Sequence, residues 1–160
     1  MEIDVVRIDK SEEVQLILGH AGFIKSVEDI YEAMINSAPS VRFGVAFAEA
    51  SGPCLVRGEG NDPGMEALAK KNALAVGAGH TFVVLFTGAY PINVINAIKS
   101  VVEVSMVFCA TSNPAEVLVV QTDLGRAVIG VVDGNIPKGV EREDGKAERK
   151  AFLRQIGYKL

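Results

Sequence analysis

The run Phe82-Val83-Val84-Leu85-Phe86 constrains the fold of this chain more than any other segment. Its five residues are aromatic, β-branched or aliphatic, and no polar residue alternates with them. A strand of this kind is normally covered by apolar groups on both faces, as in a parallel or mixed sheet flanked by helices. The run therefore predicts a central buried strand over residues 80–86 of an α/β protein.

Helices are predicted on both sides of this strand. Asp62-Pro63 offers an N-cap and a first helical residue, and Gly77-Ala78-Gly79 supplies the permissive backbone on which that helix ends. Pro91 begins another helix after the strand. Earlier in the chain, Ser26 and Asp29 form the spacing of a capping box, which predicts that a helix with one apolar face begins there.

The other apolar runs predict strands around the central one. We expect them at residues 3–8, 14–18, 42–48, 54–57, 102–110, 116–122 and 127–132. The last two are separated by the tight turn Asp123-Leu124-Gly125 and predict a hairpin. Residues 146–156 predict a charged surface helix that covers the sheet with Phe152, Leu153 and Ile156.

These elements predict one α/β domain over residues 1–160, with a mixed β-sheet flanked by helices, a late β-hairpin and a C-terminal helix. Several strands are apolar on both faces, and the helices are too few to cover all of them. Apolar strand faces that helices leave open can be buried between subunits. We therefore expect a homo-oligomer.

Composition excludes several classes of function. The formal net charge is −4, without the basic stripe that neutralises nucleic-acid phosphates. No apolar run approaches the roughly 18 residues of a membrane-spanning helix, and the N-terminus lacks the apolar core of a signal peptide. Cys54 and Cys109 match no zinc or thioredoxin spacing, so we expect free thiols, no zinc site and a cytoplasmic protein.

His80 is the strongest single candidate for chemistry. It stands between Gly77-Ala78-Gly79, whose small residues let a ligand approach the backbone, and the most buried strand. An imidazole can act as acid, base or nucleophile near neutral pH. The alternative is a core histidine bonded to a backbone carbonyl.

Phosphate loops of the Walker type, kinase catalytic loops and nucleophile elbows are all absent from the sequence.

Glu49 leads the second group of candidates. This carboxylate, in the turn that continues through Ser51, could accept hydrogen bonds from a ribose or hold a magnesium ion through water. Its alternative is a turn acid bonded to local amides. Asn61 and Asp62 are candidates for contact with a ligand hydroxyl, although Asp62 is also explained as a helix cap.

Three further polar residues lie at element ends. Asn113, in the Thr-Ser-Asn-Pro stretch after a strand, could recognise a base or a ribose, or simply form a β-turn. Asn93 shares a helix face with Asn96, which could line a pocket or face solvent. Lys25 could meet a phosphate near a helix N-terminus. His20, between glycines, is expected to be exposed.

Long segments of the chain resemble the adenosine-specific kinase family of archaea and bacteria. They are residues 23–29 (FIKSVED), 47–54 (FAEASGPC), 59–62 (EGND), 77–80 (GAGH), 90–99 (YPINVINAIK), 108–114 (FCATSNP) and 152–160 (FLRQIGYKL). The similarity spans nearly the whole chain. One position departs from the family pattern, because Gly22 stands where the family has a histidine before Phe-Ile-Lys, and we transfer no role to His20.

The resemblance implies a small α/β protein that binds adenosine or AMP and transfers a phosphoryl group to adenosine. ATP would be the phosphate donor, with Mg²⁺ as a candidate cofactor. His80 would carry the phosphate or act as a base on a ribose hydroxyl, and Glu49 would contact the ribose or a metal. The alternative is a non-catalytic adenosine or AMP sensor, or an oligomeric scaffold.

Overall fold

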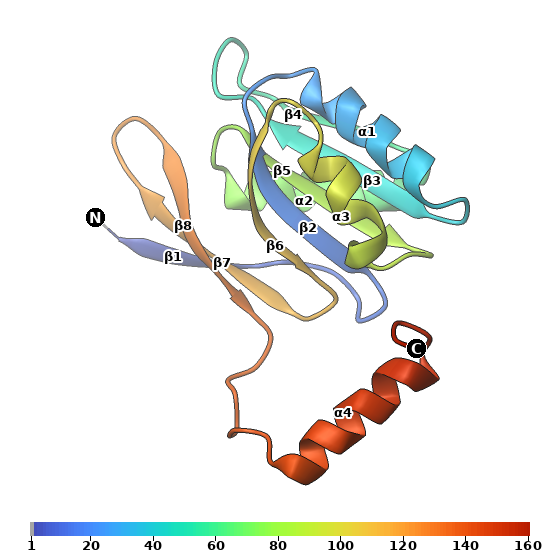
Figure 1. The fold of residues 1–160 in the computed structure, drawn as a ribbon. Coiled ribbons are helices and arrows are strands. Elements are labelled where there is room, and N and C mark those ends of the chain that lie inside the picture. The colour runs from blue at the N-terminus through green and yellow to red at the C-terminus, as the bar shows by residue number, and fades with distance from the viewer. Residues whose placement is uncertain (1) are drawn as a thin grey trace.

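The computed structural model describes residues 2–160 and confirms the α/β fold class (Figure 1). The elements are β1 (Ile3–Arg7), β2 (Gln15–Ala21), α1 (Ser26–Ser37), β3 (Arg42–Ala48), β4 (Val56–Gly60), α2 (Pro63–Val76), β5 (Thr81–Thr87), α3 (Pro91–Lys99), β6 (Val104–Thr111), β7 (Ala115–Gln121), β8 (Arg126–Asp133) and α4 (Glu143–Gln155). The expected late hairpin, β7–β8, and the C-terminal helix are both present.

The central strand is β5, as the apolar run predicts. It lies in the middle of a five-stranded sheet of order β4-β3-β5-β2-β6. Both of its neighbours pair with it in antiparallel register, and every strand pair within residues 2–160 is antiparallel. This detail differs from the mixture of pairings expected from sequence, because burial on two faces says nothing about strand direction.

Two hydrophobic cores explain why β5 does not alternate. Phe82, Val84 and Phe86 enter the core that α1 and α3 cover. Val83 and Leu85 point to the opposite face, since successive strand residues alternate in direction, and enter the core beneath α2 and the second sheet. All five side chains are fully buried.

The α2 helix lies very close to β3 because glycine permits it. A Cβ built on Gly44 would meet the backbone nitrogen of Glu66 at 2.2 Å. The helix begins as predicted, with the Asp62 carboxylate accepting a hydrogen bond from the Met65 amide at 3.0 Å. It ends at Gly77, which has a left-handed φ of 62°.

The predicted capping box of α1 is wrong. Lys25 occupies the N-cap position and makes no side-chain cap bond. Ser26 is the first helical residue and is fully buried, and its hydroxyl donates to Glu103 Oε1 at 3.2 Å instead. The carboxylate of Glu103, just before β6, therefore binds the Ser26 hydroxyl that the local spacing predicted as a helix cap.

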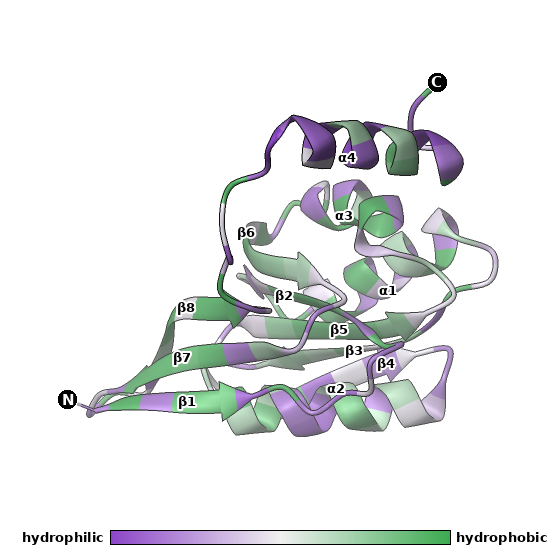
Figure 2. Cartoon of the chain, turned by 90° about the horizontal axis from the view of Figure 1, so that it is seen from below, coloured by the Kyte–Doolittle hydropathy of each residue, from purple (hydrophilic) through white to green (hydrophobic). Residues whose placement is uncertain are grey.

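The second sheet has the order β1-β7-β8 and packs one face on the core beneath α2. Val117 and Val119 of β7 point into that core and are fully buried. Apolar residues also colour much of the three strands in Figure 2.

The α4 helix stands apart from the rest of the chain (Figures 1 and 2). Its existence is confirmed, but its expected role is wrong, because none of its residues is buried and Phe152 is 56% exposed. The backbone turns away at Gly134, where φ is 71°, and the extended segment that follows carries the helix beyond the sheet. Within residues 2–160, no helix combines the length and the apolar character needed to cross a membrane.

Candidate active site at the His80 end of the sheet

His80 is held between two strands at one end of the five-stranded sheet. Because β5 runs antiparallel to both neighbours, its beginning meets the ends of β2 and β3. The His80 amide donates to the Ala48 carbonyl at 2.7 Å, and the His80 carbonyl accepts from the Ala21 amide at 2.9 Å. The backbone of His80 is therefore fixed on both sides.

The backbone conformation of His80 is unusual for a residue other than glycine. Its φ is 63°, in the left-handed region, and Cys54 is the only other such residue within residues 2–160. Asn, Asp and His tolerate this region better than most side chains, and strained backbone clusters at functional sites. Gly79 precedes it because a Cβ there would approach Ala50 Cβ to 2.8 Å.

The His80 ring is packed by two neighbouring rings. Phe47 stacks on it with centroids 5.8 Å apart, and His20 meets it edge-on at 5.6 Å. Neither ring nitrogen of His80 makes a hydrogen bond to any of residues 2–160. The imidazole is thus not a core histidine satisfied by a carbonyl, and its nitrogens are free to meet a ligand.

His20 shares this end of the sheet, although sequence reasoning expected an exposed residue without a role. Its Nδ1 lies 2.7 Å from Ser105 Oγ, and that hydroxyl donates to the His20 carbonyl at 3.2 Å. Burial, and secondarily the charge of His80, lowers the pKa of His20.

Glu49 lies in the β3–β4 turn beside His80. Its Oε2 accepts from the Leu55 amide at 2.8 Å, and its Oε1 accepts from Arg57 Nη2 at 2.9 Å. The Leu55 amide, with Arg57 as a further cause, holds the pKa of this carboxyl below its usual value. The hydrogen bond to a local backbone amide, which the alternative interpretation of Glu49 as a turn acid expects, is therefore present. Ser51 lies in the same turn, exposed.

Lys25 is neutralised by two acids. Its ammonium contacts Asp29 and lies 3.0 Å from Glu103 Oε1. The hydrogen bonds to these carboxylates raise the pKa of Lys25. A phosphate at this position would have to compete with both acids for the ammonium group.

Two cavities flank the Glu49–Arg57 pair. One, of about 580 Å³, is lined by Glu49, Gly79 and Arg126 among mostly apolar groups. The other, of about 420 Å³, is lined by Lys25 and Arg57. Within residues 2–160, the Nε atoms of Arg57 and Arg126 are buried without a hydrogen-bond partner, which leaves each a donor for a ligand.

Three of the predicted residues lie away from His80 and serve the fold. The Asn61 side chain bonds the Phe43 amide and the Val41 carbonyl, both at 2.9 Å. Asp62 caps α2, and Asn93 Oδ1 accepts from the amide before α3 at 2.8 Å. Strand register places Asn61 at the far end of β4, since Gly60 faces the start of β3.

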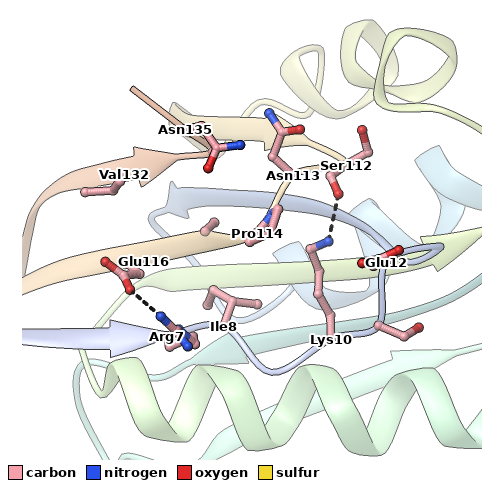
Figure 3. A pocket seen from close by; sticks show the side chains of 13 residues that line it. Arg7, Ile8, Lys10, Glu12, Ser112, Asn113, Pro114, Glu116, Val132 and Asn135 are labelled. Atoms are coloured by element: carbon pink, nitrogen blue, oxygen red, sulfur yellow. Dashed lines mark hydrogen bonds and ion pairs between the residues drawn. The ribbon is translucent and has the colours of Figure 1, made fainter. Parts of the chain in front are cut away.

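Asn113 lines a different and larger cavity, of about 680 Å³ (Figure 3). Two basic residues point along its walls, but the Lys10 ammonium bonds the Ser112 carbonyl at 2.9 Å and Arg7 pairs with Glu116 at 3.0 Å. The Asn113 amide donates to Asp133 at 3.1 Å, which fixes the end of β8. Both basic side chains of this larger cavity are therefore engaged within the chain.

Comparison with known proteins decides the family. The sequence model of the adenosine-specific kinase family matches residues 6–159 of this chain. The chain belongs to the adenosine-specific kinase family. Among solved structures it is similar to the crystal structure of the PH1918 protein from Pyrococcus horikoshii OT3. The two chains are 47% identical with a TM-score of 0.96, over 99% of this chain and 98% of that one. No curated protein matches it.

Three side chains of the site in this family member were missed from sequence: His20, Arg57 and Arg126. Arg57 and Arg126 lie on strands, where a charged residue normally indicates only the solvent face. His20 mirrors His80, since each follows a glycine at a strand end and His20 faces Thr81 in the β2–β5 register. This similarity in position to His80 was the only feature of the sequence that could have indicated His20 as a site residue.

Proposed function

We propose that this chain, as one domain over residues 1–160, binds adenosine and AMP and transfers a phosphoryl group to adenosine in the cytoplasm. The observation that carries the proposal is the His80 imidazole. Both of its nitrogens are unbonded within residues 2–160, its backbone is fixed on both sides, and the preceding Gly79 lines a cavity together with Glu49. Family membership supports adenosine as the substrate.

The nucleoside occupies the cavity between Glu49 and Arg126. Its volume of about 580 Å³ falls within the range of roughly 300–1,000 Å³ typical of small-molecule sites. The apolar wall suits a purine face, and Glu49 retains lone pairs to accept a ribose hydroxyl. Arg126 Nε offers a donor to the base or ribose. Ser51 adds a hydroxyl at the neighbouring turn.

His80 performs the transfer as a phosphate carrier. A ring nitrogen attacks the terminal phosphorus of ATP, a P–N bond forms, and the P–O bond to ADP breaks. A ribose hydroxyl then attacks the phosphorus, the P–N bond breaks, and the hydroxyl proton leaves to the imidazole or solvent. In the second version His80 only accepts that proton while ATP reacts directly.

Lys25 and Arg57 line the adjacent cavity and would contact the phosphates, in competition with the acids already paired with them. Within residues 2–160, no three His, Cys, Asp or Glu side chains are grouped to hold a metal ion. A Mg²⁺ ion brought by ATP would therefore be held chiefly by phosphates and water, with Glu49 as its carboxylate contact.

The carrier version predicts a phosphorylated His80. After incubation with ATP, the protein is digested at Lys and Arg under alkaline conditions, which preserve phosphohistidine. His20 then lies in the peptide 11–25 and His80 in the peptide 72–99, so mass spectrometry separates the two. We expect the modification on 72–99 alone. An unmodified peptide 72–99 overturns the carrier version.

His80→Asn is the appropriate variant because asparagine also tolerates a left-handed backbone and cannot hold the phosphate. We expect its formation of AMP from adenosine and ATP to fall by at least about 100-fold, the lower range for a lost acid–base group. Full turnover would remove His80 from the chemistry. Val102→Ala, at an exposed turn, is the control.

The alternative is a non-catalytic sensor or scaffold. Calorimetry with adenosine, paired with the same assay of AMP formation, distinguishes these functions from the enzyme. Binding without turnover favours the sensor, whereas neither binding nor turnover favours the scaffold.

A further inference from the structure

The chain has two histidines, and the fold brings both of them together at one end of the five-stranded sheet. The ring centroids of His20 and His80 are 5.6 Å apart, and the ring planes are inclined by 69°. The antiparallel pairing of β2 with β5 places His20 opposite Thr81, one residue from His80. No spacing in the sequence indicated this pair, because its members come from two strands far apart along the chain.

The two rings meet where both strands depart from regular geometry. Successive residues of a strand point to opposite faces, so a regular β5 would turn His80 away from Thr81 and from the His20 that faces it. Instead, His80 has a left-handed φ of 63°, and the β2–β6 register shifts beside His20. Strained backbone and irregular strand register are both common next to functional sites.

The separation of the rings is that of two imidazoles on one metal ion. A Zn²⁺–N bond is about 2.0–2.1 Å long, so imidazoles that share a tetrahedral ion hold their centroids roughly 5–6 Å apart. Rotation about the Cβ–Cγ bond turns the nitrogens of a ring but leaves its centroid nearly in place, and this torsion is broad in histidine. The rings therefore need only turn to direct one nitrogen each at a common ion.

Both rings have nitrogens available for such an ion. His20 Nδ1 lies 2.7 Å from Ser105 Oγ, and neither His20 Nε2 nor a ring nitrogen of His80 makes a hydrogen bond within residues 2–160. Metal-binding histidines hold their other ring nitrogen against an outer partner, which fixes the ring. Ser105 stands in that position for His20, and the stacked Phe47 ring orients His80.

Access and ligand chemistry favour a divalent transition metal ion. Both histidines are half-buried, so an ion can reach them from solvent. Imidazole is a preferred ligand of Zn²⁺, Ni²⁺ and Cu²⁺, whereas Mg²⁺ prefers oxygen. Within residues 2–160, no third His, Cys, Asp or Glu side chain is grouped with the pair, so water would fill the other coordination positions.

We propose that His20 and His80 together bind one divalent transition metal ion per chain, through one nitrogen of each ring. This site is independent of the proposed phosphoryl transfer, which gives His20 no role and uses no transition metal. Its consequence for catalysis does rest on the proposed function. An ion on His80 occupies a nitrogen of the ring that would attack the phosphorus or accept the proton, so metal binding would inhibit the formation of AMP.

The test is a titration of the full chain with Zn²⁺ in the absence of nucleotide, followed by NMR of the imidazole signals. Because the chain has two histidines, single variants assign both signals. We expect the two imidazoles to respond together and to saturate at one Zn²⁺ per chain, whereas Mg²⁺ moves neither. A response of one imidazole alone, or of neither, overturns the proposal.

Variants identify the ligands. Calorimetry measures the Zn²⁺ affinity of His20→Phe, which keeps an aromatic ring, and of His80→Asn, whose new side chain tolerates the left-handed backbone. We expect each variant to lose more than about 10-fold in affinity, the lower limit for losing an outer partner of a metal ligand. A folded circular dichroism spectrum confirms that each variant remains intact.

Cys54→Ser is the matched control, because Cys54 is an exposed thiol and thiols also bind Zn²⁺. Its affinity for Zn²⁺ should equal that of the unmodified protein. Unchanged affinity in either histidine variant, or a loss of binding in Cys54→Ser, overturns the assignment of the histidine pair.

The consequence for catalysis is measured separately, as AMP formation at a free Zn²⁺ concentration that saturates the site. We expect the metal-loaded protein to lose this activity, and a full rate overturns the inhibition. If the metal-free protein forms no AMP, the proposed function fails, whereas the metal site still stands or falls by the titration without nucleotide.

Discussion

At the scale of single residues, His80 shows how far local sequence carries the site. Its place before a buried strand and after Gly79 follows from the printed sequence, and the structure confirms that placement. Its left-handed backbone and its neighbours Phe47 and His20 do not follow from it. They depend on which strands meet at this edge of the sheet, and only the tertiary fold decides that.

The His20–His80 contact predicts a measurable shift in a pKa. Burial is the larger cause that lowers the pKa of His20 and the charge of His80 the smaller. In His80→Asn, we expect the pKa of His20 to rise toward 6.5 without reaching it, because burial remains. Titration of the imidazole signals by NMR measures this directly. An unchanged or lower pKa in the variant would contradict the contact.

At the scale of elements, most helices and strands could be predicted, and the errors have physical causes. The strand predicted over 14–18 continues to Ala21, through Gly19. The pair of glycines around His20 indicates a turn locally, but a Cβ on Gly19 would lie 2.4 Å from the Phe82 ring of β5. The glycine makes room for an aromatic ring some 60 residues away, so local pattern could not reveal it.

The close approach of α2 to β3 predicts a large effect of one methyl group. In Gly44→Ala the new Cβ would clash with the backbone of Glu66, which cannot move without shifting the helix. We expect the unfolding free energy to fall by about 1–3 kcal/mol or more, as for overpacked cores. Urea denaturation measures the change.

Gly125→Ala is the control for this effect, since a Cβ there meets nothing within 4 Å. Equal losses in the two variants would show that the helix–strand contact is not as close as described.

At the scale of the whole molecule, the expected homo-oligomer predicts how stability depends on protein concentration. An assembly that forms only from folded chains unfolds at a higher temperature when the protein is more concentrated. We expect the Tm of the protein to rise with concentration over a hundredfold range, and scanning calorimetry at several concentrations measures this rise. A constant Tm would contradict the assembly.

The place of α4 was the feature least predictable from sequence. Apolar strands in excess of helices indicated that some surface is buried between subunits. The same pattern predicted that Phe152, Leu153 and Ile156 cover the chain's own sheet, because periodicity shows that a helix has an apolar face but not which molecule it meets. The direction of the backbone at Gly134 decides between these, and that is a property of three dimensions.

The turn at Gly134 has one more consequence. A side chain there would meet the side chain of Asn113, whose own amide bonds Asp133 at the end of β8. The direction in which the chain leaves the sheet is therefore set at this one glycine. A substitution at Gly134 would redirect the whole C-terminal helix without changing any residue of the helix itself.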